Sequence, residues 1–300
     1  MRFPGITITR AAPIPNSRFR RLPRRVSAWC PTGVLICLAF LSADAAGQRV
    51  AAIAPDGNPR SAEYAERLLS TMPEPLRVVD ISAASSAFES VGVESPYNLN
   101  LDEARRIGAV IGCDYFLLIA AANQRRSSSA KPSFFEAYAS IFLASSRSGR
   151  LILWTLDRVE GESAESADEM LINSAGKMAA ELRQKIISAR EGELAAQEFT
   201  PFTEVPEEGK PEAKGLRPPL PYRRIKPEYT LTAYLYSVIA TVDIFVDITE
   251  EGELANIDIA RWAGYGLDES VIENVRKMNW RPATRNGRKL PMRVLLRYNF

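Results

Sequence analysis

The sequence contains no histidine. Because histidine is the commonest general base and the commonest zinc ligand, this absence excludes Ser-His and Cys-His nucleophile pairs and most zinc sites. Cysteine is scarce as well: Cys30, Cys37 and Cys113 are too few and too scattered for a four-cysteine metal site or a disulfide framework. Hydrophobic residues make up 46% and charged residues 25%, which excludes collagen-like, coiled-coil and disordered classes. The composition therefore favours a binding module over an enzyme.

Motifs typical of catalytic and nucleotide-binding sites are also missing. There is no G-x-S-x-G elbow, and Gly176-Lys177 lacks the upstream glycine of a phosphate loop. Gly264-Tyr-Gly266 lacks the third glycine of a dinucleotide site and predicts a tight turn before Leu267. We therefore expect no catalytic residue, no cofactor and no metal ion.

The amino-terminal segment has the pattern of an export signal. The first 25 residues hold seven arginines and no acid, an uncharged run covers 26–43, and Ala43-Asp-Ala45 follows. This order of basic, apolar and small residues predicts a cleaved signal peptide over residues 1–45. The alternative is a retained inner-membrane anchor, because 18 uncharged residues rise about 27 Å as a helix, barely the hydrocarbon thickness. Both interpretations place the rest in the periplasm, either free after cleavage or anchored by residues 26–43.

The exported part is mildly acidic. Of the 38 basic and 36 acidic residues, seven and one lie in residues 1–45, which leaves 31 against 35. This balance argues against nucleic acid as a partner. Cys113 precedes the apolar run 115–122, so a buried, inert thiol is expected.

Residues 46–197 predict an α/β sandwich domain of order β-α-β-α-β-β-β-α. Strands are expected at 49–55, 76–81 and 114–120, and a hairpin at 134–144 and 150–159. Helices are expected at 61–72, 101–112 and 164–193; Asn100 and Glu103 make a capping box for the second of these.

Residues 198–221 hold six prolines together with alternating acids and lysines. Such a segment prefers extended conformations and cannot bury a core. It predicts a spacer between two domains.

Residues 222–300 predict a small β-β-α-β domain, which makes the whole chain α+β. Alternation between 238 and 248 predicts a strand that turns at 249–253 and pairs with 254–261. Apolar residues from Leu267 to Met278 have helical spacing, and 290–300 alternate to the last residue.

The region 218–300 resembles the TonB C-terminal domain family. The residues that carry the resemblance are Pro227-Glu-Tyr-Thr230, Asp247-Ile-Thr-Glu-Glu-Gly252, Gly264-Tyr-Gly-Leu-Asp-Glu269, Trp280-Arg-Pro-Ala283, Asn286-Gly287, Pro291 and Phe300. The resemblance implies capture of a short extended peptide, the TonB box of an outer-membrane TonB-dependent receptor, by addition to the sheet. A sheet whose last strand lies at the chain end suits this role, because its edge can pair with another peptide.

The expected peptide-binding edge is therefore the last strand: Leu290, Met292, Arg293, Val294, Leu295, Leu296, Arg297, Tyr298, Asn299 and Phe300. The even-numbered residues belong mainly to the core, which leaves the backbone edge and the outward side chains for binding. The auxiliary residues are Lys226, Pro227, Glu228, Tyr229 and Thr230, with threonine where the family usually has proline. The basic stretch 276–297 is either a solvated face or a docking surface for an acidic partner.

Two functions follow from the resemblance. The first is energy-dependent transport across the outer membrane, with residues 1–45 as the anchor. The second is a soluble periplasmic adaptor or scaffold without energy transduction. TonB proteins coupled to an ExbB–ExbD complex usually carry a histidine in the anchor, so its absence here argues against that partner. More weakly, residues 101–116 resemble periplasmic domains of the TolB amino-terminal and CsgG families, which are binding and assembly modules.

Overall fold

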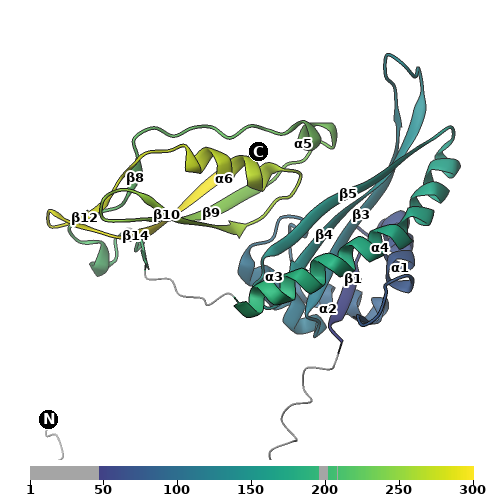
Figure 1. Ribbon diagram of the computed structural model, residues 1–300, viewed down its shortest axis with the longest axis horizontal. Coiled ribbons are helices and arrows are strands. Elements are labelled where there is room, and N and C mark those ends of the chain that lie inside the picture. Colours follow the sequence, from purple (N-terminus) through teal and green to yellow (C-terminus); the bar gives the residue numbers. More distant parts are fainter. Residues whose placement is uncertain (1–46, 196–201, 208) are drawn as a thin grey trace, which may run out of the picture. The chain divides into compact units, whose positions relative to one another are not determined.

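The computed structural model describes residues 47–195, 202–207 and 209–300. The chain is α+β, as the sequence predicts, and residues 46–300 form one compact unit. We call residues 47–195 the N-lobe and the described residues from 202 to 300 the C-lobe (Figure 1). The signal peptide or anchor predicted for residues 1–45 lies outside the described residues.

The N-lobe is a five-stranded sheet with the strand order β2-β1-β3-β4-β5. Helices α1 and α4 pack on one face, and α2 and α3 pack on the other (Figure 1). The central strands are long apolar runs because both faces of the sheet are covered. The elements are β1 (Arg49–Ile53), α1 (Pro59–Ser70), β2 (Arg77–Val78), α2 (Ile81–Val91), α3 (Leu101–Ile111), β3 (Tyr115–Arg126), β4 (Phe134–Ser145), β5 (Leu151–Gly161) and α4 (Ala164–Ala195).

Local sequence signals predicted helix α3 but not helix α2. The capping box at Asn100 and Glu103 forms as expected, and Gly112 ends α3 in the left-handed conformation. The sequence analysis missed α2, so the order of the lobe is β-α-β-α-α-β-β-β-α. This helix is short and rich in serine and alanine, and Asp80 caps its start by accepting a hydrogen bond from the Ala83 N–H.

The C-lobe centres on a four-stranded sheet with the order β10-β9-β14-β6. Helix α6 covers one face of this sheet and completes a core that includes Val242, Leu267 and Leu296. The elements are β6 (Thr203–Glu204), a 3₁₀ turn (Pro211–Ala213), β7 (Leu216–Arg217), β8 (Leu220–Pro221), α5 (Leu231–Leu235), β9 (Thr241–Ile248), β10 (Leu254–Arg261), α6 (Leu267–Arg276), β11 (Trp280–Arg281), β12 (Ala283–Arg285), β13 (Arg288–Leu290) and β14 (Met292–Asn299).

The proline-rich stretch differs from the expected spacer. Its described part supplies three short strands that pair with C-lobe strands: β6 with β14, β7 with β12, and β8 with β11. These pairings satisfy backbone groups of the stretch, and Pro219 is buried within it. The division into an N-terminal domain, a linker and a C-terminal domain stays a prediction.

Candidate functional site

The outer edge of β14 carries free backbone groups in a defined pattern. The Phe300 N–H donates to the Ala240 carbonyl at 2.9 Å, in register with the antiparallel pairing of β14 with β9. Because antiparallel strands exchange bonds at alternate residues, Leu295, Arg297 and Asn299 point their N–H and C=O groups away from β9. The edge therefore offers three donors and three acceptors.

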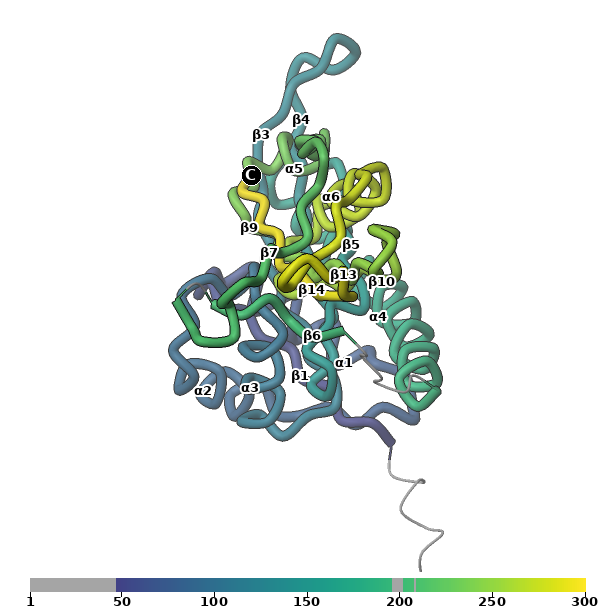
Figure 2. The backbone as a smooth tube through the Cα atoms, turned by 90° about the vertical axis from the view of Figure 1, so that its left-hand side faces the viewer, coloured from purple at the N-terminus to yellow at the C-terminus, as the bar shows by residue number. Residues whose placement is uncertain are grey.

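The start of this edge is already occupied by β6, which the figures show beside β14 (Figure 2). Met292 pairs with Thr203 in parallel register, and the Val205 N–H donates to the Arg293 carbonyl at 2.9 Å. Within the part of the chain that the structure describes, no strand pairs with this side of β14 from Val294 onward. The open edge is therefore shorter than the sequence analysis expected.

Most of the predicted edge residues lie on β14, with two exceptions: Leu290 precedes the strand and Phe300 follows its last residue. Leu290 belongs to β13, where it pairs with Ala283, and Pro291 separates it from β14. The even-numbered residues face the core: Met292 and Leu296 are buried, and Val294, Tyr298 and Phe300 pack against it. The odd-numbered residues Arg293, Leu295, Arg297 and Asn299 lie on the opposite face.

Two buried carboxylates on β9 hold the arginines of this opposite face. Arg293 donates to both oxygens of Asp247 at 2.7 and 2.8 Å, and Arg297 donates to both oxygens of Asp243 at 2.7 and 2.9 Å. These forked contacts raise the pKa of both guanidinium groups through hydrogen bonding to the carboxylates. The sequence analysis did not predict this pairing. The signal was present, since the two aspartates of β9 and the two arginines of β14 have the same four-residue spacing on strands that pair with each other.

The auxiliary residues form an irregular segment beside the end of β14. Thr230 caps α5 by accepting from the Ala233 N–H, and its hydroxyl donates to the Tyr265 carbonyl at 2.6 Å. The Tyr229 hydroxyl lies 3.1 Å from the Ala233 carbonyl, and its ring stacks on Phe300 with 6.3 Å between centroids. Pro227 is buried, while Lys226 and Glu228 are exposed. The segment is therefore fixed next to the carboxyl end of the strand.

A strained turn connects β10 to α6. Gly264, Tyr265 and Gly266 all have positive φ, as the predicted tight turn requires. Asp268, in the first turn of α6, closes this turn by accepting from the N–H groups of Ala263 at 3.0 Å and Gly264 at 2.8 Å. Burial of the carboxyl group raises the pKa of Asp268 to about 7.

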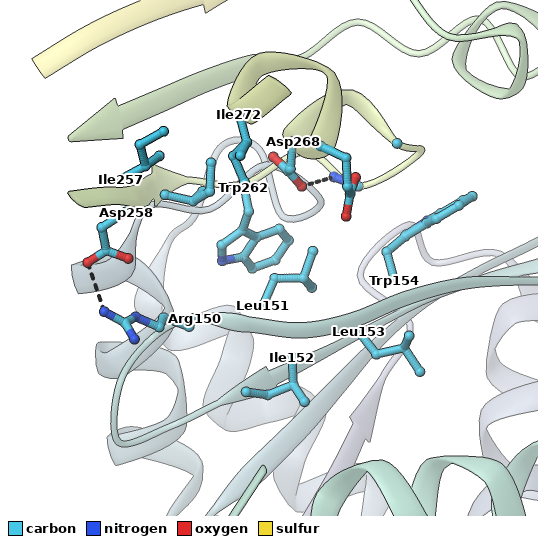
Figure 3. Close-up of a pocket in the computed structure, with 14 residues that line it drawn as sticks. Arg150, Leu151, Ile152, Leu153, Trp154, Ile257, Asp258, Trp262, Asp268 and Ile272 are labelled. Carbon is cyan, nitrogen blue, oxygen red and sulfur yellow. Dashed lines mark hydrogen bonds and ion pairs between the residues drawn. The ribbon is translucent and has the colours of Figure 1, made fainter. Parts of the chain in front are cut away.

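A cleft of 380 Å³ lies where β5 faces β10 and α6 (Figure 3). Arg150, which directly precedes β5, and Asp258 on β10 are 2.8 Å apart at one end of it. Trp262 projects toward the N-lobe, where its indole N–H donates to the Gly149 carbonyl at 3.2 Å and its ring lies 5.7 Å from Phe142. The two lobes therefore share a packed contact.

Asn98 of the N-lobe forms a polar part of this contact. Its side chain donates to the carbonyls of Thr241 at 2.8 Å and Trp262 at 2.7 Å, and accepts from the Thr241 N–H at 2.9 Å. Nearby, Arg261 donates to the Asn98 carbonyl at 2.6 Å and reaches Glu103 at 3.4 Å. Asn98 thus satisfies three backbone groups at the start of β9 and the end of β10.

The described residues contain no cluster of side chains that could hold a metal ion. None of the helices in residues 47–195, 202–207 and 209–300 combines the length and apolarity needed to cross a bilayer. Cys113 is a free, buried cysteine, and burial raises the pKa of its thiol.

Comparison with known proteins identifies a family for residues 227–300. A search of curated proteins finds no match. Among solved structures, the TonB CTD of Pseudomonas aeruginosa is similar at 16% identity, over 34% of this chain and 94% of that one, with a TM-score of 0.25. The PelC dodecamer of Paraburkholderia phytofirmans gives 12% identity over 44% and 85%, with a TM-score of 0.28. Lipoprotein GNA1162 of Neisseria meningitidis gives 14% identity over 47% and 99%, with a TM-score of 0.29. Residues 227–300 match the family described as Gram-negative bacterial TonB protein C-terminal, and this part of the chain belongs to the TonB C-terminal domain family.

Proposed function

We propose that the C-lobe captures an extended peptide of an outer-membrane TonB-dependent receptor by pairing it with the open edge of β14. The observation that carries this proposal is the row of outward N–H and C=O groups at Leu295, Arg297 and Asn299. The family of residues 227–300 supports a TonB-like role in the envelope and is not a family of enzymes. Main-chain hydrogen bonds would supply the affinity of such a complex.

The side chains beside the edge would set which peptides bind. Leu295 is exposed between Arg293 and Arg297, and both arginines are engaged by buried aspartates. Their charges are therefore largely neutralised on this face. We expect selection by the shape and apolarity of the peptide side chain opposite Leu295 more than by acidic residues.

Proline substitution separates backbone pairing from side-chain contact. Because the Leu295 N–H points away from β9, Leu295→Pro removes an outward donor and leaves the ladder with β9 intact. Leu295→Ala is the matched control, since it removes the side chain but keeps the N–H. In the full chain, we expect Leu295→Pro to weaken binding of a labelled TonB-box peptide about tenfold or more, and Leu295→Ala to weaken it less.

The readout is fluorescence anisotropy, with circular dichroism to verify that both variants melt as the wild type does. Equal affinities of the folded proline variant and the wild type would exclude strand addition at this edge. A loss of binding with alanine as large as with proline would instead assign the affinity to the leucine side chain.

Peptide capture by this protein has two candidate functions. Energy-dependent transport requires a tether to the inner membrane, for which residues 26–43 are the candidate. A periplasmic adaptor needs no tether, and the absence of histidine favours it over coupling to an ExbB–ExbD complex. The intact mass of the protein recovered from the cell envelope distinguishes them. A chain that retains residues 26–43 has the tether that energy transduction requires. A chain that begins near Ala46 lacks this tether, which favours the adaptor.

A further inference from the structure

The 380 Å³ cleft between β5 and β10, here called the interlobe cleft, runs along the edges of two sheets (Figure 3). Strand β5 is the last strand of the N-lobe sheet, and β10 is the first strand of the C-lobe sheet. Four consecutive residues of β5 line the cleft, although Leu151 and Trp154 pack on the α2–α3 face of the sheet and Ile152 and Leu153 on the α1–α4 face. Because both faces contribute, the cleft passes the edge of the strand.

The outer edge of β10 offers free backbone groups to the interlobe cleft. Even-numbered residues of β9 bond to β14, so the odd-numbered Phe245 bonds to its partner on β10, Asp258. On either side of Asp258, Ile257 and Ile259 therefore point their N–H and C=O groups away from β9, and both residues line the cleft. Within the described part of the chain, no strand pairs with this side of either isoleucine.

The end of the same edge already pairs with the N-lobe. Asn100 forms an antiparallel bridge with Arg261, and the Trp262 N–H donates to the Leu99 carbonyl at 3.2 Å. Trp262 also lines the interlobe cleft. The cleft therefore continues an existing backbone pairing along the unpaired part of β10.

The lining of the interlobe cleft is acidic on balance. Its titratable residues are Arg150, Asp258, Asp268 and Glu269. Arg150 is paired with Asp258, and Asp268 accepts from two backbone N–H groups. Glu269 is exposed in the first turn of α6 and, in residues 47–195, 202–207 and 209–300, takes part in no ion pair. The cleft therefore favours a ligand with a positive charge near Glu269.

We propose that the interlobe cleft binds an extended, apolar segment of a partner protein that carries a basic residue, by adding it to the outer edge of β10. Its main chain would pair with Ile257 and Ile259, and its side chains would pack against Leu151 and Trp154. An acyl chain fits less well, because it would cover the backbone groups of β10 without giving them hydrogen-bond partners.

This site goes beyond capture of a receptor peptide. Strands β10 and β14 lie on opposite sides of β9, so segments bound at the two edges would not overlap. The C-lobe would then hold two extended segments at once, which suits a protein that connects two partners.

The test measures anisotropy of a fluorescein-labelled peptide, Lys-Val-Thr-Val-Thr-Val-Lys, with the full chain. Ile257→Pro removes an outward N–H, and Ile257→Ala is the matched control that keeps it. We expect the proline variant to weaken binding about tenfold or more and the alanine variant to weaken it less. A TonB-box peptide, measured in parallel, should bind both variants as it binds the wild type, so that failure of this site and failure of the β14 edge are distinguishable.

A second pair of variants tests the charge. Glu269→Lys should weaken binding of the lysine peptide about fivefold, whereas Glu273→Lys should not change it, because Glu273 is exposed one turn later on α6 and outside the lining. If the Ile257→Pro variant does not fold, N-methylation of alternate peptide amides replaces it. One of the two alternating sets should then weaken binding to the wild type about tenfold.

Four results would overturn the proposal. The first is no binding of the lysine peptide to the wild type. The second is equal affinity of the folded Ile257→Pro variant and the wild type, or of both N-methylated peptides and the unmodified one. The third is an equal loss of both peptides with Ile257→Pro, which would assign them to a single edge. The fourth is an equal effect of Glu269→Lys and Glu273→Lys, which would place the charge preference outside the cleft.

Discussion

At the scale of single residues, Arg293 and Arg297 make similar forked contacts but differ in what their removal leaves behind. The Arg293 side chain is 12% exposed, and without it Asp247 keeps one weak contact, from Asn256 at 3.3 Å. Arg297 is 59% exposed, and Arg261 remains 3.5 Å from Asp243 when it is removed. We expect Arg293→Ala to lower the free energy of unfolding by about 3–5 kcal/mol. Arg297→Ala should cost about 1 kcal/mol or less.

Urea unfolding of the two variants at one pH measures this difference. The arginines are matched controls for each other, since both lie on the same face of β14. Equal costs would mean that solvent reaches Asp247 as readily as Asp243 and would contradict the burial argument.

The titration of Asp268 makes the free energy of unfolding depend on pH. Its folded pKa of about 7 lies above the ordinary value because the carboxyl group is buried. As the pH rises from about 4 to about 7, the carboxyl group ionises in the unfolded chain before it ionises in the folded one. The unfolded state therefore binds fewer protons, and the contribution of Asp268 to stability falls over this window.

The variant Asp268→Asn removes that titration. We expect the free energy of unfolding of the variant to improve relative to the wild type between pH 4 and pH 8, measured by urea unfolding at several pH values. A difference that stays constant would show an unshifted pKa. A difference of opposite sign would show that the hydrogen bonds from Ala263 and Gly264 dominate over burial.

At the scale of elements, β6 occupies the part of the β14 edge that an incoming peptide would otherwise extend along. Val205→Pro removes the N–H that donates to the Arg293 carbonyl, and Val205→Ala keeps it. If β6 competes with the peptide, the proline variant should bind a TonB-box peptide a few-fold more tightly, because about 1 kcal/mol of competing pairing is lost. The measurement is peptide anisotropy with both variants. Identical affinities would mean that the peptide pairs only beyond Arg293.

Sequence patterns predicted the elements with strong periodicity and missed those that depend on distant partners. The alternation over 238–248 and the helical spacing after Leu267 predicted β9 and α6, because one face of each is buried. Strand β6 is only two residues long and forms because β14 offers it an edge. The arginine pairs were missed for the same reason, since periodicity assigns a face but does not identify the neighbour across it.

At the scale of the whole molecule, the two lobes meet through Asn98 and Trp262, while the division into two domains with a spacer stays a prediction. The spacer prediction was based on composition, which describes what a segment cannot bury but not what pairs with it. The contact buries an indole against Phe142 and satisfies backbone groups of β9 and β10. If this contact makes the two lobes unfold together, a peptide bound to the C-lobe would also stabilise the N-lobe against unfolding.

Asn98→Ala tests that coupling. The substitution leaves two carbonyls and one N–H of the C-lobe without their partner, and we expect a loss of about 2–4 kcal/mol between the lobes. Urea unfolding, followed by tryptophan fluorescence and far-ultraviolet circular dichroism, should change from one transition in the wild type to two in the variant. Asn123→Ala is the control, because Asn123 makes two hydrogen bonds within the N-lobe, to Ala164 and Asp168. The Asn123→Ala variant should unfold at a lower urea concentration than the wild type, but still in a single transition. Two transitions in the wild type would mean that the lobes fold independently, and a single transition in the Asn98 variant would place the coupling in the Trp262 contact instead.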